Sequence, residues 1–202
     1  MSDVELLALH GLAVRKAAPA AAVADLLGRD QSEVVAALDA ATADGRAIAA
    51  KGMFMVTPAG REWLAERYSS VFAELRANPL ATEAYQRFEV INRQLLALFT
   101  DWQMIPAGSD RVPNDHSNAD YDHGVIDQIG AQHERAQRPL GQFAELVARL
   151  GRYLERLDAA YDNVLAGDLD FVSGARIDSY HTVWFELHED LLRMLGRERE
   201  EQ

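Results

Sequence analysis

Residues 30–60 constrain the fold more than any other part of the chain, because three local patterns follow one another within them. Val34, Leu38 and Ala41 recur at intervals of three and four residues, which predicts a helix with one buried face. Two short apolar runs then flank Lys51-Gly52, a dipeptide typical of a tight turn. The segment therefore predicts a helix followed by a two-stranded hairpin.

Capping residues mark the ends of these elements. Asp30 and Ser32 are N-cap candidates for the helix, and Gly45 can adopt the left-handed conformation that ends it. Thr57 and Pro58 open a further helix, with Thr57 as the N-cap and Pro58 at the first helical position. The boundaries and the periodicity therefore agree.

Two more helices are expected upstream, ending near residues 17 and 28, so the complete order is helix, helix, helix, hairpin and helix. In this order the chain resembles the winged helix-turn-helix family of transcription regulators, of the MarR and PadR type. The residues that carry the resemblance are Ala24-Asp25-Leu26-Leu27-Gly28, Val34 to Leu38, Asp44-Gly45-Arg46 and Phe54-Met55-Val56-Thr57-Pro58-Ala59-Gly60-Arg61. The resemblance covers roughly the first third of the chain.

The length of 202 residues suits two small domains. We expect a mainly α fold. Residues 1–68 are expected to form a winged helix with three helices and a short β-hairpin, and residues 69–202 are expected to form a helical bundle. By the resemblance, the bundle joins two copies into a homodimer and can bind a small-molecule effector. The dimer would present two heads to successive major grooves of double-stranded DNA.

Composition limits the metal sites, the membrane contacts and the cellular compartment that the chain can have. The chain has no cysteine, which excludes disulfides and thiolate metal sites, and nothing in it requires a cofactor. No run approaches the roughly 20 apolar residues that span a bilayer, and no leader pattern opens the chain, so we expect a cytoplasmic protein without membrane contact. Lysine occurs only at positions 16 and 51 while arginine and alanine abound, a bias typical of GC-rich bacterial genomes.

The formal net charge is -12, and most of the acidic excess follows residue 68. Such a charge repels nucleic acid at long range and favours protein or small-molecule partners. DNA affinity must therefore come from a few residues of the head. The candidate contacts are Arg29, Gln31, Ser32, Arg46, Lys51 and Arg61.

Gln31 can pair with adenine, whereas the arginines and Lys51 suit phosphates or a minor groove. Ser32 fits a helix cap better than a base contact. Glu33 and Asp39 on the same helix oppose phosphate contact unless they face away. The alternative is a protein-interaction module that does not bind DNA and uses the winged helix as a docking surface.

The second half of the chain reads as a series of amphipathic helices. Apolar stripes predict helices over residues 58–76, 79–102, 119–137 and 139–165, with Pro139 opening the last of these, and over residues 180–195. Between them, residues 105–118 are rich in Gly, Pro, Asn, Asp and Ser and predict a long irregular loop.

The densest polar cluster follows this loop. Asp115, His116, Asp120 and His123 can converge as metal ligands or as an acid–base group. The same stretch also fits a helix N-terminus, capped by Ser117 or Asn118 and carrying acids in the first turn. The capping interpretation is favoured because it needs no ligand.

Aromatic and histidine residues suggest a further site. The candidates for a pocket between helices of the bundle are Trp102, Tyr180, His181 and Trp184. The chain has no nucleophile elbow, no glycine-rich phosphate loop and no cysteine nucleophile. We therefore predict that the protein is not an enzyme, with a metal-dependent enzyme built on the cluster at 115–123 as the least favoured hypothesis.

Overall fold

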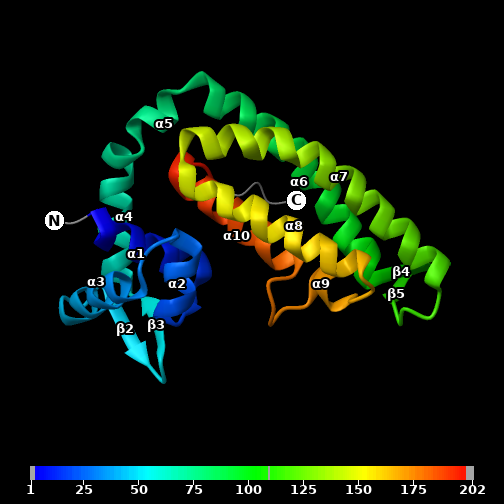
Figure 1. Cartoon of the computed structure of the whole chain (residues 1–202), viewed down its shortest axis with the longest axis horizontal. Coiled ribbons are helices and arrows are strands. Elements are labelled where there is room, and N and C mark those ends of the chain that lie inside the picture. Colours follow the sequence, from blue (N-terminus) through cyan, green and yellow to red (C-terminus); the bar gives the residue numbers. More distant parts are fainter. Residues whose placement is uncertain (1–2, 109, 199–202) are drawn as a thin grey trace. The chain divides into compact units, whose positions relative to one another are not determined.

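The computed structural model describes residues 3–108 and 110–198, and the chain is mainly helical (Figure 1). Its residues group into two compact units. Unit 1 contains the described residues up to Asn78 and those from Glu186 onward, and unit 2 spans Pro79–Phe185. The expected division at residues 68 and 69 differs from this grouping, because the C-terminal segment returns to the first unit. No helix of the described residues is long and apolar enough to cross a membrane.

Unit 1 begins with the predicted helices and hairpin. A short strand that the sequence did not predict, β1, precedes the second helix and pairs with β3, so that β3 lies between β1 and β2 in an antiparallel sheet. Figure 1 shows the β2–β3 hairpin extending away from the three helices that precede it. The elements are α1 (Asp3–Arg15), β1 (Ala17–Ala18), α2 (Ala20–Leu27), α3 (Gln31–Ala43), β2 (Ala47–Ala50), β3 (Met53–Val56), α4 (Pro58–Val71) and α5 (Ala73–Ala77).

The predicted caps of unit 1 are present. Asp30 caps α3 by accepting a hydrogen bond from Ser32 N at 2.8 Å, and Thr57 caps α4 by accepting one from Gly60 N at 3.1 Å. Lys51 and Gly52 both have positive φ, of 52° and 77°. Two successive left-handed residues match the twist of a two-residue hairpin turn. The local sequence therefore fixes where these elements begin and turn.

A buried hydrogen-bond chain joins three helices of unit 1. His10 on α1 lies 2.8 Å from the Tyr68 hydroxyl of α4 through Nδ1 and 2.8 Å from Asp190 Oδ1 of α10 (Tyr180–Leu195) through Nε2. His10 and Asp190 have no exposed surface, and Tyr68 is almost fully buried. An ionised carboxylate only accepts hydrogen bonds, so Nε2 carries a proton and donates to Asp190. In the neutral imidazole, Nδ1 then accepts a hydrogen bond from the Tyr68 hydroxyl, so both ring nitrogens have a partner.

Two further contacts hold the C-terminal half of α10 in the same unit. Arg76 of α5 donates to the carbonyl oxygens of Met194 at 2.8 Å and Arg193 at 3.2 Å. These carbonyls belong to the last turn of α10, where the helix offers unpaired acceptors and a negative dipole end. Arg15 of α1 lies 3.3 Å from Glu186. A segment remote in sequence is thus part of the core of unit 1.

Replacing Asp190 by Ala should destabilise the protein by about 3–5 kcal/mol, because it removes one partner of a buried pair and leaves His10 Nε2 without that acceptor. Urea unfolding measures the loss. The exposed Asp39 of α3 provides the matched control, and its change to Ala should alter stability by less than about 0.5 kcal/mol. Equal effects of the two changes would contradict a structural role for the buried chain.

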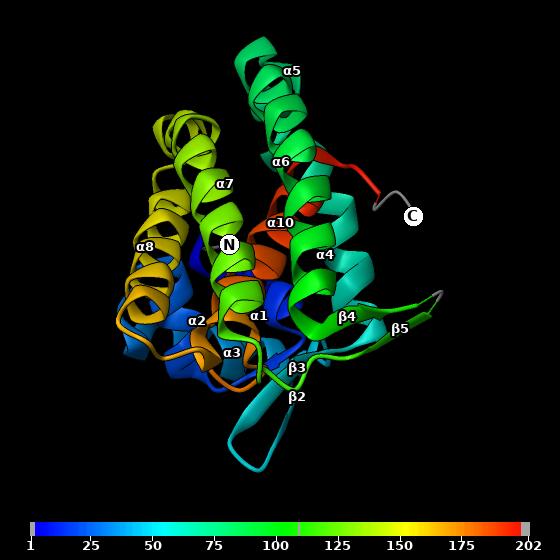
Figure 2. The same cartoon turned by 90° about the vertical axis from the view of Figure 1, so that its right-hand side faces the viewer.

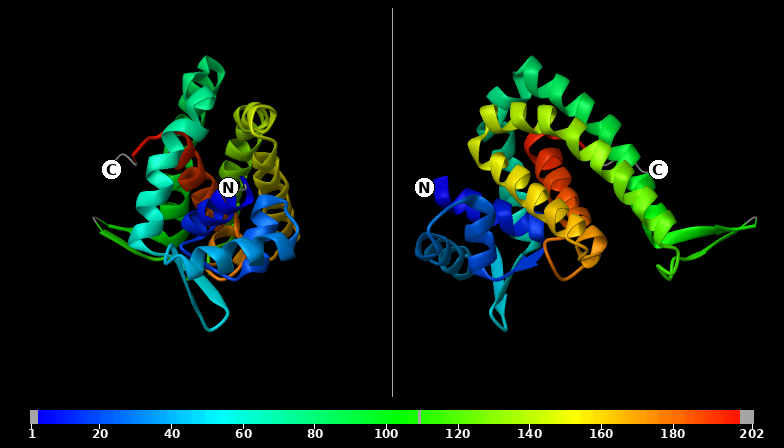
Figure 3. Two further views of the ribbon diagram at one scale, coloured as in Figure 1. Left: turned by 90° about the vertical axis from the view of Figure 1, so that its left-hand side faces the viewer. Right: turned by 45° about the vertical axis from the view of Figure 1, so that its right-hand side comes forward.

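Unit 2 is built around two long helices that pack along their lengths, as the right-hand view of Figure 3 shows. They run antiparallel and are joined by a hairpin that extends from their ends (Figure 2). The first residues of α10, up to Phe185, belong to this unit. Its elements are α6 (Pro79–Gln103), β4 (Met104–Ala107), β5 (Asp110–Pro113), α7 (Ala119–Leu146), a 3-10 turn (Ala148–Leu150), α8 (Gly151–Leu165) and α9 (Asp170–Ser173).

The apolar stripe predicted for the first of these helices is confirmed. Its members are buried, and the core that they form with the other elements of the unit contains the largest fully buried side chains of the described residues. Buried here are Tyr85, Phe88, Ile91, Leu95, Phe99, Trp102, Phe143, Tyr153, Tyr180 and Trp184.

Two predictions for this region are wrong. The expected irregular loop at 105–118 contains the antiparallel hairpin β4–β5, in which Ile105 pairs with Val112 and Pro106 with Arg111. Proline is normally depleted in strands, but an isolated exposed hairpin leaves edge positions that tolerate it. Pro139 does not open a helix, because α7 continues through it to Leu146. The buried stripe of Ala136, Leu140 and Phe143 crosses the proline and holds the helix together.

Candidate functional site

The two predicted DNA contacts at the start of α3 differ in whether hydrogen bonds within the protein already occupy them. Asp30 accepts hydrogen bonds from both the hydroxyl and the backbone N–H of Ser32. These bonds, that of the hydroxyl first, lower the pKa of the Asp30 carboxyl below its usual range. Ser32 is therefore engaged in capping, while Gln31 beside it is exposed.

The exposed positions of α3 carry two acids and no cation. Val34, Leu38 and Ala41 are buried, whereas Glu33 and Asp39 are exposed at different positions around the helix. No basic residue lies on this helix. Any attraction to phosphate must therefore come from the segments around α3.

Arg46 is held within the unit. Its guanidinium forms ion pairs with Glu5 of α1 and Asp44, and it lies over the Trp63 ring of α4 at 4.8 Å. Only 12% of its side chain is exposed. Arg67 lies over the same ring at 4.0 Å. The structure places Arg46 as a link between α1, the hairpin and α4 rather than on the outer surface.

Arg29, Lys51 and Arg61 are exposed, and no carboxylate pairs with them within the described part of the chain. Arg29 directly follows the left-handed Gly28 that ends α2, and Lys51 lies at the hairpin turn. Arg61 on the first turns of α4 donates to the Val56 carbonyl at 3.1 Å. The unit therefore keeps three of its predicted cations available for an anionic partner.

Lys16 adds a cation that the sequence analysis did not select. It is exposed and has a φ of 64°, and it immediately precedes β1. The sequence carries no sign of this position, because a single lysine between two apolar segments does not belong to a helical or strand pattern. It lies beside the sheet because β1, which follows it, pairs with β3.

One face of the sheet is apolar and exposed. Ile48 lies opposite Met55, and Ala50 lies opposite Met53, so these four side chains share a face. Ile48 is 48% exposed, Met53 37% and Met55 38%. The unit thus presents an apolar strip as well as cations.

Gly60 fixes where the hairpin meets α4. A Cβ at this position would lie 2.0 Å from the Arg46 carbonyl oxygen and 2.8 Å from Val56 Cγ1. The same carbonyl accepts a hydrogen bond from Thr57 N at 3.0 Å. Only glycine lets the first turn of α4 approach the hairpin so closely.

Replacing Gly60 by Ala should lower stability by about 1–3 kcal/mol, because backbone must move to admit the methyl group. Gly124 in α7 is the control, since a Cβ there meets nothing within 4 Å. Its change to Ala should raise stability by about 0.5–1 kcal/mol. Thermal unfolding of both variants measures the difference. A Gly60→Ala protein as stable as the wild type would contradict the close packing.

The polar cluster after the β4–β5 hairpin forms a joint between two helices. Asp122 is 3% exposed, accepts from Asn114 Nδ2 at 2.8 Å and lies 3.0 Å from His116 Nδ1. Asn114 also donates to the Trp102 carbonyl at 3.0 Å, and the His116 ring packs against the Trp102 ring at 4.5 Å between centroids. These contacts connect the end of α6 to the start of α7.

The predicted members of this cluster do not meet as a metal site. Asn118 caps α7 by accepting from Tyr121 N at 3.2 Å, as the capping interpretation expected. Asp115 accepts from Ser117 N, and its bonds with Ser117 lower the pKa of the Asp115 carboxyl. Asp120 and His123 are exposed on the first turns of α7. Within residues 3–108 and 110–198, no three His, Cys, Asp or Glu side chains gather as metal ligands.

The predicted pocket residues are packed in the core of unit 2. Trp184 stacks on Phe88 at 4.9 Å, and its indole Nε1 donates to Asn92 Oδ1 at 3.0 Å. Tyr180 is 1% exposed, and burial raises the pKa of its hydroxyl. Trp102 lies instead beside His116. Trp102, Tyr180 and Trp184 are all buried side chains of the interior of unit 2.

His181 is the partly exposed member of the set. Its ring packs edge-on against Phe99 at 4.7 Å and lies 4.4 Å from Phe185. Burial lowers the pKa of His181 below its ordinary value of 6.5. Burial also lowers the pKa of His133, with Asp158 opposing the shift.

Because the pKa values of His133 and His181 are lower in the folded state, these histidines bind protons at a higher pH in the unfolded chain than in the folded one. The free energy of unfolding should therefore be highest above the unfolded pKa of 6.5 and should decrease as the pH falls below it. Urea unfolding at about pH 7.5 and about pH 5.5 measures the decrease. In a His181→Phe variant the decrease should be smaller, and an unchanged decrease would show that His181 does not contribute.

No protein-family model matches the chain, and comparison with curated proteins and with solved structures found no match. The function is therefore inferred from the chemistry and geometry of the chain's own residues.

Proposed function

We propose that the protein is a winged-helix transcription regulator that binds double-stranded DNA through unit 1. The element order α1, β1, α2, α3, β2, β3 with the sheet order β1-β3-β2 supports the winged-helix assignment. In such a module α3 enters a groove and the β2–β3 hairpin is the wing. The observation that carries the proposal is a set of three exposed cations that have no carboxylate partner among the described residues: Arg29 just before α3, Lys51 at the turn of the hairpin and Arg61 on α4.

The roles of the residues follow from their positions. Lys51 at the tip of the hairpin and Arg61 on α4 suit phosphate contacts, and Arg29 suits a phosphate beside the start of α3. Gln31 is the exposed amide that can read a base edge, through a bidentate contact to adenine. Arg46 contributes by holding the hairpin and α4 in place.

The remaining parts of the proposal follow from the resemblance to regulators of this type. Two copies would form a homodimer through the helical unit and contact two half-sites about one helical turn apart. A small-molecule effector would change the spacing of the heads by favouring one conformation. The protein would act in the bacterial cytoplasm, by binding and without catalysis.

A duplex-binding titration across a salt series tests the proposal. Affinity should fall as salt rises from about 50 mM to about 200 mM, since phosphate contacts release counterions. A Lys51→Ala, Arg61→Ala double variant should bind more weakly and reduce the slope of log K against log salt by about 2. Genomic fragments serve as the duplexes and fluorescence anisotropy as the readout.

An Arg93→Ala, Arg176→Ala double variant is the charge-matched control, because it also removes two exposed positive charges but outside unit 1, and it should leave the salt slope unaltered. If the wild-type protein binds no duplex even at about 50 mM salt, the proposal is overturned. An equal loss in the Arg93→Ala, Arg176→Ala variant would show that only net charge matters.

The second candidate function is a protein-docking module that uses the same unit without binding DNA. The exposed acids Glu33 and Asp39 of α3 and the exposed apolar strip of Ile48, Met53 and Met55 favour it. Exposed apolar surface beside charge is typical of protein-interaction sites. The same titration separates the two, because this function predicts no binding to duplex at any salt concentration.

A further inference from the structure

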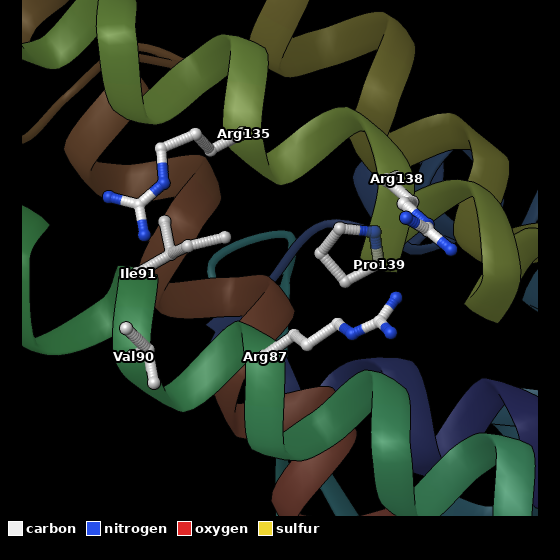
Figure 4. A pocket seen from close by; sticks show the side chains of 6 residues that line it. All are labelled: Arg87, Val90, Ile91, Arg135, Arg138 and Pro139. Atoms are coloured by element: carbon white, nitrogen blue, oxygen red, sulfur yellow. The ribbon is translucent and has the colours of Figure 1, made fainter.

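A pocket of about 290 Å³ opens on the surface of unit 2 between α6 and α7. Its apolar lining comes from Val90 and Ile91 of α6 and from Pro139 of α7. Figure 4 shows three arginine side chains around these apolar groups, Arg87 from α6 and Arg135 and Arg138 from α7. An arginine cluster of this kind stands out in a chain with a net charge of -12.

The arginines are only partly neutralised. Arg135 donates to Gln94 Oε1 at 2.6 Å and Gln132 Oε1 at 2.9 Å, both of which are neutral amides. These bonds orient the guanidinium and leave its charge uncompensated. For Arg138, which is exposed, no carboxylate pairs with it within residues 3–108 and 110–198.

Arg87 is the exception, because its guanidinium forms an ion pair with Glu83 one turn earlier on α6. Three positive charges thus face one carboxylate around the pocket. In Figure 4 the Arg87 and Arg138 guanidinium groups both lie beside the Pro139 ring. Like charges lining one pocket repel each other unless an anion lies between them.

The apolar lining is also incompletely covered. Val90 is 42% exposed, whereas Ile91 beneath it is 4% exposed and Pro139 is buried. A ligand that covers Val90 would remove apolar surface from water and gain free energy in proportion to the area covered. The pocket therefore offers both an anion-binding rim and an apolar floor.

We propose that this pocket binds a small, doubly charged organic anion of the phosphate-monoester type that carries a short apolar group. The two uncompensated guanidinium groups match the charge of a phosphate monoester near neutral pH. Planar guanidinium forks bind phosphate oxygens in pairs, which lysine cannot do. The apolar group lies on Val90, Ile91 and Pro139.

The size of the pocket sets the class of ligand. A volume of about 290 Å³ lies at the lower end of small-molecule sites. A stable protein interface buries about 800 Å² on each partner, far more than six lining residues supply. The proposal does not depend on DNA binding by unit 1, so either can fail without the other.

An NMR titration of the 15N-labelled full chain with phenyl phosphate at about pH 7.5 tests the proposal. Amide signals from α6 and α7 residues around the pocket should shift and saturate with a Kd below about 1 mM. Inorganic phosphate, which lacks the apolar group, and phenol, which lacks the charge, should each bind at least about tenfold more weakly.

Arg138→Gln should weaken phenyl phosphate at least about tenfold. Arg138 is exposed, and its side chain forms no hydrogen bond or ion pair within the described part of the chain, so this variant should fold normally. The control is Arg93→Gln, which removes an exposed arginine of α6 outside the pocket and should leave binding unchanged. Absence of saturation up to about 10 mM, or equal loss in both variants, would overturn the proposal.

An acidic polypeptide is the competing occupant. A poly-glutamate peptide that shifts the same signals more strongly than phenyl phosphate, with the shift lost in Arg138→Gln, would overturn the proposal in favour of a protein partner.

Discussion

The buried chain from Tyr68 through His10 to Asp190 is the interaction on which unit 1 depends. It brings α1, α4 and α10 to one point, and both ring nitrogens of His10 have a hydrogen-bond partner at 2.8 Å, although the imidazole has no exposed surface. Such a network is directional, unlike the apolar core around it, so it specifies how the three helices pack. It also makes the C-terminal half of α10 part of the same unit as the proposed DNA-binding elements.

The arginines of unit 1 are of two kinds, those bound to other groups inside the unit and those exposed on its surface. Arg46 and Arg76 are bound internally, the first to Glu5, Asp44 and the Trp63 ring and the second to carbonyls at the end of α10. Arg29 and Arg61 have no carboxylate partner among the described residues and are exposed. Arg46 and Arg76 stabilise the packing of the unit, whereas Arg29 and Arg61 are the arginines that we propose attract an anionic partner despite the acids of α3.

Local sequence signals predicted the elements of unit 1 well, because caps, turns and periodicity act over a few residues. They failed where the outcome depends on contacts between distant segments. Pro139 lies inside α7 because its neighbours share a buried stripe, and residues 104–107 pair with residues 110–113 despite two prolines. For the site, the sequence found exposed cations such as Lys51, but it selected Arg46 and missed His10, whose partners lie 58 and 180 positions away.

Hydrogen–deuterium exchange of the full chain, with and without a bound duplex, tests the central claim most directly. If unit 1 reads DNA as proposed, the duplex should slow exchange in residues 29–33 and in the β2–β3 hairpin, the segments that carry Arg29, Gln31 and Lys51. Exchange on the β4–β5 hairpin should be unchanged. Protection confined to unit 2, or an unchanged exchange pattern at saturating duplex, would contradict the account.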